Sequence, residues 1–196
     1  MKISTVYQKG NRDINEDAIV VDTNKNIFAV IDGATGLGGL PGSLASGIIK
    51  ESLEKDTPIE MKDKIIEGNI RLRAAAESNY GEQLSLEQIP KHKRSSCGLA
   101  AIKINKNPQG EASSIDFISA ADCMLFLQFS DSSIRQITFN HIDKLDGVAI
   151  STIQKAWCDY LKIAPNIEDI SIEKQKQMHI PLEKMFRKCS RQTEIN

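Results

Sequence analysis

The sequence predicts an α+β fold in which antiparallel sheets are flanked by helices. Three observations support this prediction. Segments with a period of two occur near the N-terminus and again in the middle of the chain, two segments with a helical period lie between them, and further helical segments follow. Runs of strands and runs of helices in this order differ from the strict alternation that is typical of parallel sheets.

The N-terminal part predicts strands at residues 2–8, 17–23 and 26–32. The last two are rich in β-branched and apolar residues, and the turn-forming run Thr23-Asn24-Lys25-Asn26 separates them. Residues 33–42 contain five glycines, which predicts a loop whose backbone approaches another group closely.

The next part predicts two helices. The first begins at Ser43 and ends before Pro58, because apolar residues fall on one face between these positions. The second spans residues 59–78. Residues 80–95 are polar, with a basic run at Lys91–Arg94, and predict a loop that contains a short helix. This basic run is a solvated loop or a docking site for acidic or phosphorylated substrates.

The period of two then returns. Strands are predicted at residues 97–104, 114–120, 123–129 and 133–138. Helices follow at residues 142–163 and 167–189, and Pro181 is expected to kink the last one. The length of 196 residues suits a single domain, 1–196.

Composition excludes several classes of function. The net charge is −1 and the pI is about 6.3, which argues against nucleic-acid or membrane-surface binding. No apolar run approaches the roughly 20 residues that span a bilayer, and a signal peptide is absent from the N-terminus, so a cytoplasmic location is expected. The four cysteines form no pair with zinc-ligand spacing. The glycine-rich loop lacks the Gly-Lys-Ser/Thr ending of a nucleotide-binding P-loop.

Two acidic clusters stand at the ends of two predicted strands that follow each other in the chain, 17–23 and 26–32. Glu16-Asp17 begins one strand and Asp32-Gly33 ends the other, so their carboxylates are expected to meet at one sheet edge. Oxygen-only clusters of this kind hold Mg²⁺ or Mn²⁺. Arg12, four residues before Glu16, could hold a phosphate beside the metal. The plainer alternative is a solvated strand start and an ordinary turn.

These residues resemble the metal-dependent serine/threonine phosphatases of type 2C, the PPM family. The resemblance covers residues 1–138 and rests on four motifs in order. They are Arg12-x-x-Asn15-Glu16-Asp17, Phe28-Ala29-Val30-Ile31-Asp32-Gly33, Ser96-Cys97-Gly98-Leu99-Ala100-Ala101 and Ile118-Ser119-Ala120-Ala121-Asp122. It implies an α-β-β-α sandwich and hydrolysis of a phosphorylated serine or threonine of a protein substrate, with a role in signalling.

The resemblance also implies a role for each site residue. Asp32 bridges two Mn²⁺ or Mg²⁺ ions, about 3.5–4 Å apart, that activate a shared water. The Gly33 carbonyl coordinates one ion, and Glu16 and Asp17 coordinate the other. Arg12 clamps the substrate phosphate, so Arg12 and Asp32 are the expected catalytic residues. Asp122 lies near an additional metal position.

The chain departs from the family in three places. The loop after Asp32-Gly33 lacks the histidine of many members, and the Gly-Asp-Ser-Arg turn is replaced by Ala121-Asp122-Cys123-Met124. The family's later Ser-Asp-Gly and Asp-Asn motifs, which supply metal carboxylates, have no counterpart after residue 140. The domain is therefore expected to be incomplete at its C-terminus, as a truncated or a natural short form.

The alternative function is an inactive or weak phosphatase-like module that binds a partner or a phosphoprotein. The oligomeric state stays open.

Overall fold

The computed structural model describes residues 1–11, 13–36, 39–81, 84–143, 147–148, 150–152 and 155. The chain divides into two compact units, Met1–His141 and Ile142–Asn196. The first unit contains every helix and strand that the structure describes with defined bounds. A single domain over residues 1–196 stays a prediction.

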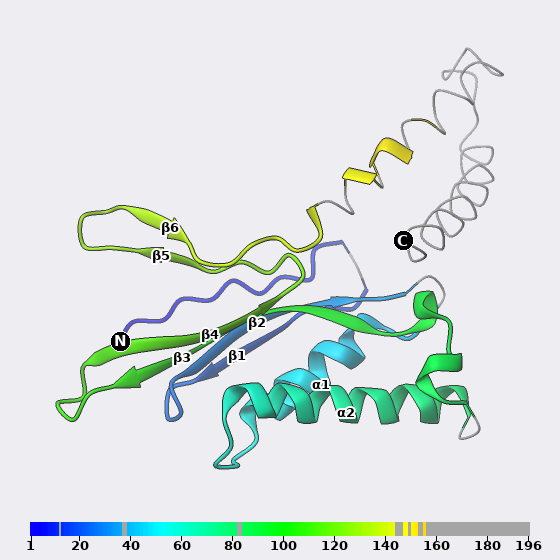
Figure 1. Ribbon diagram of the computed structural model, residues 1–196, viewed down its shortest axis with the longest axis horizontal. Coiled ribbons are helices and arrows are strands. Elements are labelled where there is room, and N and C mark those ends of the chain that lie inside the picture. The colour runs from blue at the N-terminus through cyan, green and yellow to red at the C-terminus, as the bar shows by residue number, and fades with distance from the viewer. Residues whose placement is uncertain are drawn as a thin grey trace. The chain divides into compact units, whose positions relative to one another are not determined.

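Four antiparallel strands form one sheet in the order β1–β2–β3–β4 (Figure 1). The strands are β1 (Ala18–Asp22), β2 (Ile27–Ala34), β3 (Ser96–Lys106) and β4 (Ala112–Ala120). The sheet therefore joins the N-terminal strand pair to the strands from the middle of the chain. This arrangement confirms the α+β class and the four strands predicted for these positions.

Two helices cover one face of this sheet (Figure 1). Helix α1 (Gly42–Glu54) packs on β1, β2 and β3, and α2 (Met61–Tyr80) packs on α1. The period of two on β2 explains which face they cover: Ile27, Ala29 and Ile31 are buried, whereas Val30 between them is 49% exposed. The predicted loop at 80–95 contains two short 3₁₀ helices, η1 (Leu86–Gln88) and η2 (Lys91–Lys93).

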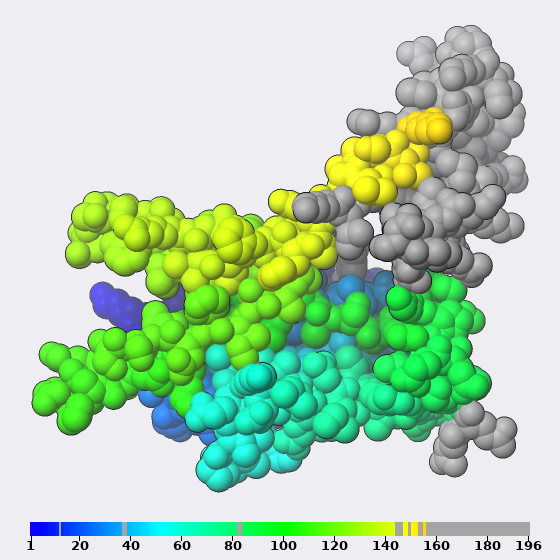
Figure 2. All heavy atoms as spheres, in the orientation of Figure 1, coloured from blue at the N-terminus to red at the C-terminus, as the bar shows by residue number. Residues whose placement is uncertain are grey.

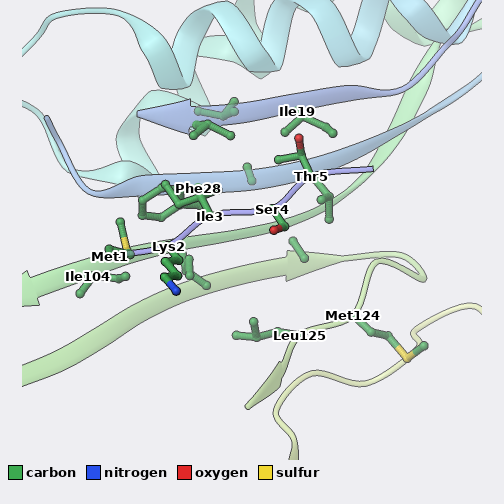
Figure 3. Close-up of a pocket in the computed structure, with 16 residues that line it drawn as sticks. Met1, Lys2, Ile3, Ser4, Thr5, Ile19, Phe28, Ile104, Met124 and Leu125 are labelled. Atoms are coloured by element: carbon green, nitrogen blue, oxygen red, sulfur yellow. The ribbon is translucent and has the colours of Figure 1, made fainter. Parts of the chain in front are cut away.

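The prediction of a strand at residues 2–8 is wrong, because the structure places these residues outside any sheet. Alternation of apolar and polar residues produces a strand only where a neighbouring strand supplies main-chain hydrogen bonds. Met1–Thr5 instead run across the sheet face that the helices leave open (Figure 3). There they line an apolar pocket of about 420 Å³ together with Ile19, Phe28 and Leu125.

A separate hairpin follows the four-stranded sheet. It consists of β5 (Phe126–Gln128) and β6 (Ile134–Gln136), which are shorter than the predicted strands 123–129 and 133–138. Beyond the ladder, the N–H of Ile137 still donates to the Leu125 carbonyl at 2.8 Å, whereas the N–H of Leu125 donates to the Thr138 hydroxyl at 2.8 Å. In Figure 2 the dark blue atoms of the N-terminal segment lie between this hairpin and the hairpin of β3 and β4.

The predicted C-terminal helices fall mostly outside the described residues. Positions 143, 147–148, 150–152 and 155 are helical, in agreement with the helix predicted at 142–163. The hydroxyl of Ser151 donates to the Gly147 carbonyl at 2.7 Å, as expected within a helix. The rest of that helix and all of 167–189 lie outside the described residues. Within the part that the structure describes, no helix is long and apolar enough to cross a membrane.

Candidate metal and phosphate site

An acidic pocket of about 570 Å³ lies where β1 begins and β2 ends. Its lining includes Lys9, Glu16, Asp17, Asp32 and Thr35, and we call it the acidic pocket throughout. The ladder between β1 and β2 pairs Ala18 with Ile31, and the same register one residue further sets Asp17 opposite Asp32. Directly opposite side chains in an antiparallel pair have Cβ atoms about 4.5–5.5 Å apart. The expected meeting of the two acidic clusters is therefore present for Asp17 and Asp32.

Asp122 reaches the same sheet edge from the turn after β4. Gly98 on β3 pairs with Asp32 on β2. A Cβ atom on Gly98 would lie 3.2 Å from Asp122 Oδ1 and 3.2 Å from Cys123 Sγ. The missing side chain at Gly98 thus leaves the space beside Asp32 that the Asp122 carboxylate and the Cys123 thiol occupy. Gly98 and Cys123 stand within the sequence motifs without an expected role of their own, although a glycine inside a strand marks close approach of another group.

The turn that presents Asp122 contains an unusual backbone conformation. Ala121 has φ +61°, a left-handed conformation that costs a non-glycine residue roughly 1–2 kcal/mol. The main-chain N–H of His141 donates to the Ala121 carbonyl at 3.0 Å and anchors the turn. His141 therefore supports the loop that carries Asp122.

Glu16 lines the acidic pocket but also interacts with the start of helix α1. Its Oε1 atom accepts hydrogen bonds from the Thr35 hydroxyl and, at 2.9 Å, from the Gly42 N–H. Helix α1 has no capping side chain of its own at Pro41, so Glu16 stabilises its first turn from outside. Ser95 does the same by accepting from the Ala45 N–H at 3.2 Å. One Glu16 oxygen thus has a structural role that the sequence did not reveal.

Gly33 is required by packing. A Cβ atom there would lie 2.1 Å from the Glu16 carbonyl oxygen and 2.7 Å from the Gly42 main chain. The end of β2 and the start of α1 therefore meet backbone to backbone, with Gly33 and Gly42 facing each other. This explains the Asp-Gly pair without a metal, and the metal role of the Gly33 carbonyl stays a prediction.

The glycine-rich loop also packs on main chain, as the sequence predicted. Cβ atoms on Gly36 and Gly39 would lie 2.2 Å from the His92 carbonyl oxygen and 2.4 Å from the Lys93 carbonyl oxygen. The N–H of Leu40 donates to Lys93 at 3.0 Å. The described part of this loop is therefore joined to the basic run, whose Arg94 guanidinium donates twice to the Ile89 carbonyl, at 2.8 and 2.9 Å.

The thiols near the site are neutral at neutral pH. Burial raises the pKa of Cys97 to about 11, with smaller contributions from the charges of Cys123 and Asp32. Burial also raises the pKa of Cys123, partly offset by a hydrogen bond with the Asp32 main chain. A thiol must lose its proton before it binds a metal, whereas the carboxylate and carbonyl oxygens at this edge can bind one without that step. Such a set matches Mg²⁺ or Mn²⁺ in kind.

The arrangement of these donors is looser than a formed metal site. Among the described residues, no three side chains of His, Cys, Asp or Glu come together as a group that could hold a metal ion. Arg12, the predicted phosphate clamp, lies outside the described residues. The structure thus brings Asp17, Asp32 and Asp122 to one edge and turns one Glu16 oxygen toward helix α1.

Comparison with known proteins gives few matches. No model of a known protein family and no curated protein matches the sequence. Among solved structures, the Mycobacterium tuberculosis serine/threonine phosphatase PstP/Ppp matches with 20% identity and a TM-score of 0.47, and covers 66% of this chain. The catalytic domain of PstP in complex with two manganese ions matches with 20% identity and a TM-score of 0.49. PppA, a regulatory component of the T6SS in Pseudomonas aeruginosa, matches with 17% identity and a TM-score of 0.44. The chain covers 49–51% of these structures.

Proposed function

We propose that this chain carries the N-terminal part of a metal-dependent phosphatase site that acts on phosphorylated serine or threonine in proteins. The supporting observation is the juxtaposition of Asp32 with Asp17, by strand register, and with Asp122, through the space left by Gly98. Asp17 and Asp32 line the acidic pocket of about 570 Å³, and Asp122 lies against the space that Gly98 leaves open on the neighbouring strand. These are positions in the sequence that resemble the metal-binding motifs of type 2C phosphatases.

In this proposal each residue has a distinct role. Asp32, Asp17 and Asp122 hold Mn²⁺ or Mg²⁺ through their oxygens, with the Gly33 carbonyl and the second carboxylate oxygen of Glu16 as further ligands. Arg12 binds the phosphate of the substrate. A bound metal would supply a water of lowered pKa as the nucleophile. The carboxylates would hold that metal, and Arg12 would hold the phosphate of the substrate.

The role of Asp32 predicts the outcome of a direct test. In the presence of Mn²⁺, the full chain is expected to release phosphate from a phosphothreonine peptide. Asp32→Asn should lower this rate by at least about 100-fold, beyond the roughly 10–100-fold losses typical of residues that only orient metal ligands. Phosphate release is measured with and without a chelator.

Asp116→Asn is the matched control. Asp116 is also an exposed strand carboxylate of the same sheet, but it does not line the acidic pocket. It accepts a hydrogen bond from Asn105 and lies opposite Lys103 in the register of β3 and β4. Its substitution should leave the rate unchanged. Equal rates for the wild-type chain and Asp32→Asn would contradict the assignment. Metal-dependent binding of the phosphopeptide without turnover would instead favour a binding module.

A further inference from the structure

We propose that Lys9 is a second phosphate-binding residue of the acidic pocket. This inference rests on the proposed function and adds to it a residue that the sequence motifs do not contain. Among the described residues that line the pocket, Lys9 carries the one positive charge, beside the carboxyl groups of Glu16, Asp17 and Asp32. Its side chain is exposed to solvent and therefore accessible to a ligand that enters the pocket.

Two hydrogen bonds hold the segment of Lys9 against the pocket. The Tyr7 hydroxyl donates to the Asp17 carbonyl at 2.9 Å, which fixes the chain just before Lys9. The Lys9 Nζ donates to the Asp13 carbonyl at 3.1 Å, across a turn in which Gly10 has φ +61°. The Lys9 ammonium is thus bonded to the turn that follows it, while its side chain remains exposed to solvent.

The charge of the pocket gives Lys9 its proposed role. Three carboxyl groups surround the space, and a phosphomonoester is itself close to a dianion at neutral pH. Repulsion between them weakens phosphate binding unless cations compensate. An ammonium group has three donors, and the bond to Asp13 uses one of them. The remaining donors can bind phosphate oxygens, because lysine binds phosphate as a point charge.

The test measures binding, independently of turnover. The full chain in Mn²⁺ is titrated by calorimetry with a phosphothreonine peptide and with the same peptide carrying threonine. Lys9→Met should weaken binding of the phosphopeptide by about tenfold, the loss expected for one charge-assisted hydrogen bond, and leave binding of the threonine peptide unchanged. Lys9→Arg should retain most of the affinity. Lys2→Met, the same charge change in the same segment but at the apolar pocket, is the control.

The outcomes separate this inference from the proposed function. Wild-type affinity in Lys9→Met, an equal loss in Lys2→Met, or no preference of the wild-type chain for the phosphopeptide would each overturn the role of Lys9. Phosphate release is followed in the same samples. Binding that depends on Lys9 without any release would contradict the hydrolase and support Lys9 as a phosphate ligand.

Discussion

At the residue scale, Gly98 determines how Asp122 approaches Asp32. Asp17 and Asp32 come together through the register of β1 and β2, which requires only two adjacent strands. Asp122 joins them from a turn ninety residues later in the chain, because Gly98 leaves the space beside Asp32 open. A side chain at Gly98 would compete with Asp122 and Cys123 for this space.

Gly98→Ala is therefore expected to reduce Mn²⁺ affinity more than stability. The added methyl group would lie 3.2 Å from Asp122 Oδ1 and Cys123 Sγ, which are side-chain ends that can move by a few tenths of an ångström. We expect a change of less than about 1 kcal/mol in the free energy of unfolding. Calorimetric Mn²⁺ titration and urea unfolding measure the two effects. Unchanged Mn²⁺ affinity would show that Asp122 does not need this position.

At the element scale, the contact between β2 and α1 fixes the site. Gly33 and Gly42 meet backbone to backbone, and Glu16 and Ser95 supply acceptors for the first turn of the helix. The helix start therefore depends on residues before β1 and before β3. This contact places Glu16 and Asp32 at the same end of the sheet.

Gly33→Ala is expected to destabilise the protein strongly. Its Cβ atom would lie 2.1 Å from the Glu16 carbonyl oxygen, and backbone atoms cannot move aside without displacing α1 from β2. We expect a loss of about 2–4 kcal/mol in the free energy of unfolding, measured in urea. Gly47→Ala is the control, because a Cβ atom at this position in α1 meets nothing within 4 Å. It should stabilise the protein by about 0.5–1 kcal/mol. Similar effects at both positions would contradict the close packing.

At the scale of the whole molecule, a buried lysine makes stability depend on pH. Lys64 is 2% exposed, and its ammonium donates to the Lys55 carbonyl just after α1 ends. Burial lowers the pKa of Lys64, and the nearby Lys25 charge adds to this effect. The folded state thus releases this proton at lower pH than the unfolded state, whose pKa is near 10.5. The contribution of Lys64 to the free energy of unfolding therefore increases as the pH rises through the pKa of the folded state toward 10.5.

The comparison with Lys64→Met isolates this effect. The free energy of unfolding of the wild-type chain, minus that of Lys64→Met, is expected to increase with pH, with a slope of at most about 1.4 kcal/mol per pH unit. Urea unfolding at several pH values between 7 and 10 measures it. Lys62→Met, which removes a lysine from an exposed position of the same helix, is the control. A flat difference for Lys64→Met would mean that its amine remains hydrated.

The sequence by itself determined the α+β class, four strands, two helices and the order of the acidic motifs, because periodicity and turn residues are local properties of the chain. It failed at residues 2–8, since alternation does not show whether a neighbouring strand is present. Only the tertiary structure decided that Gly98 makes room for Asp122, that Glu16 caps α1, and that Lys9 lines the acidic pocket. These contacts join segments far apart in the chain or on either side of a turn. They depend on strand register and helix docking, which no local pattern specifies.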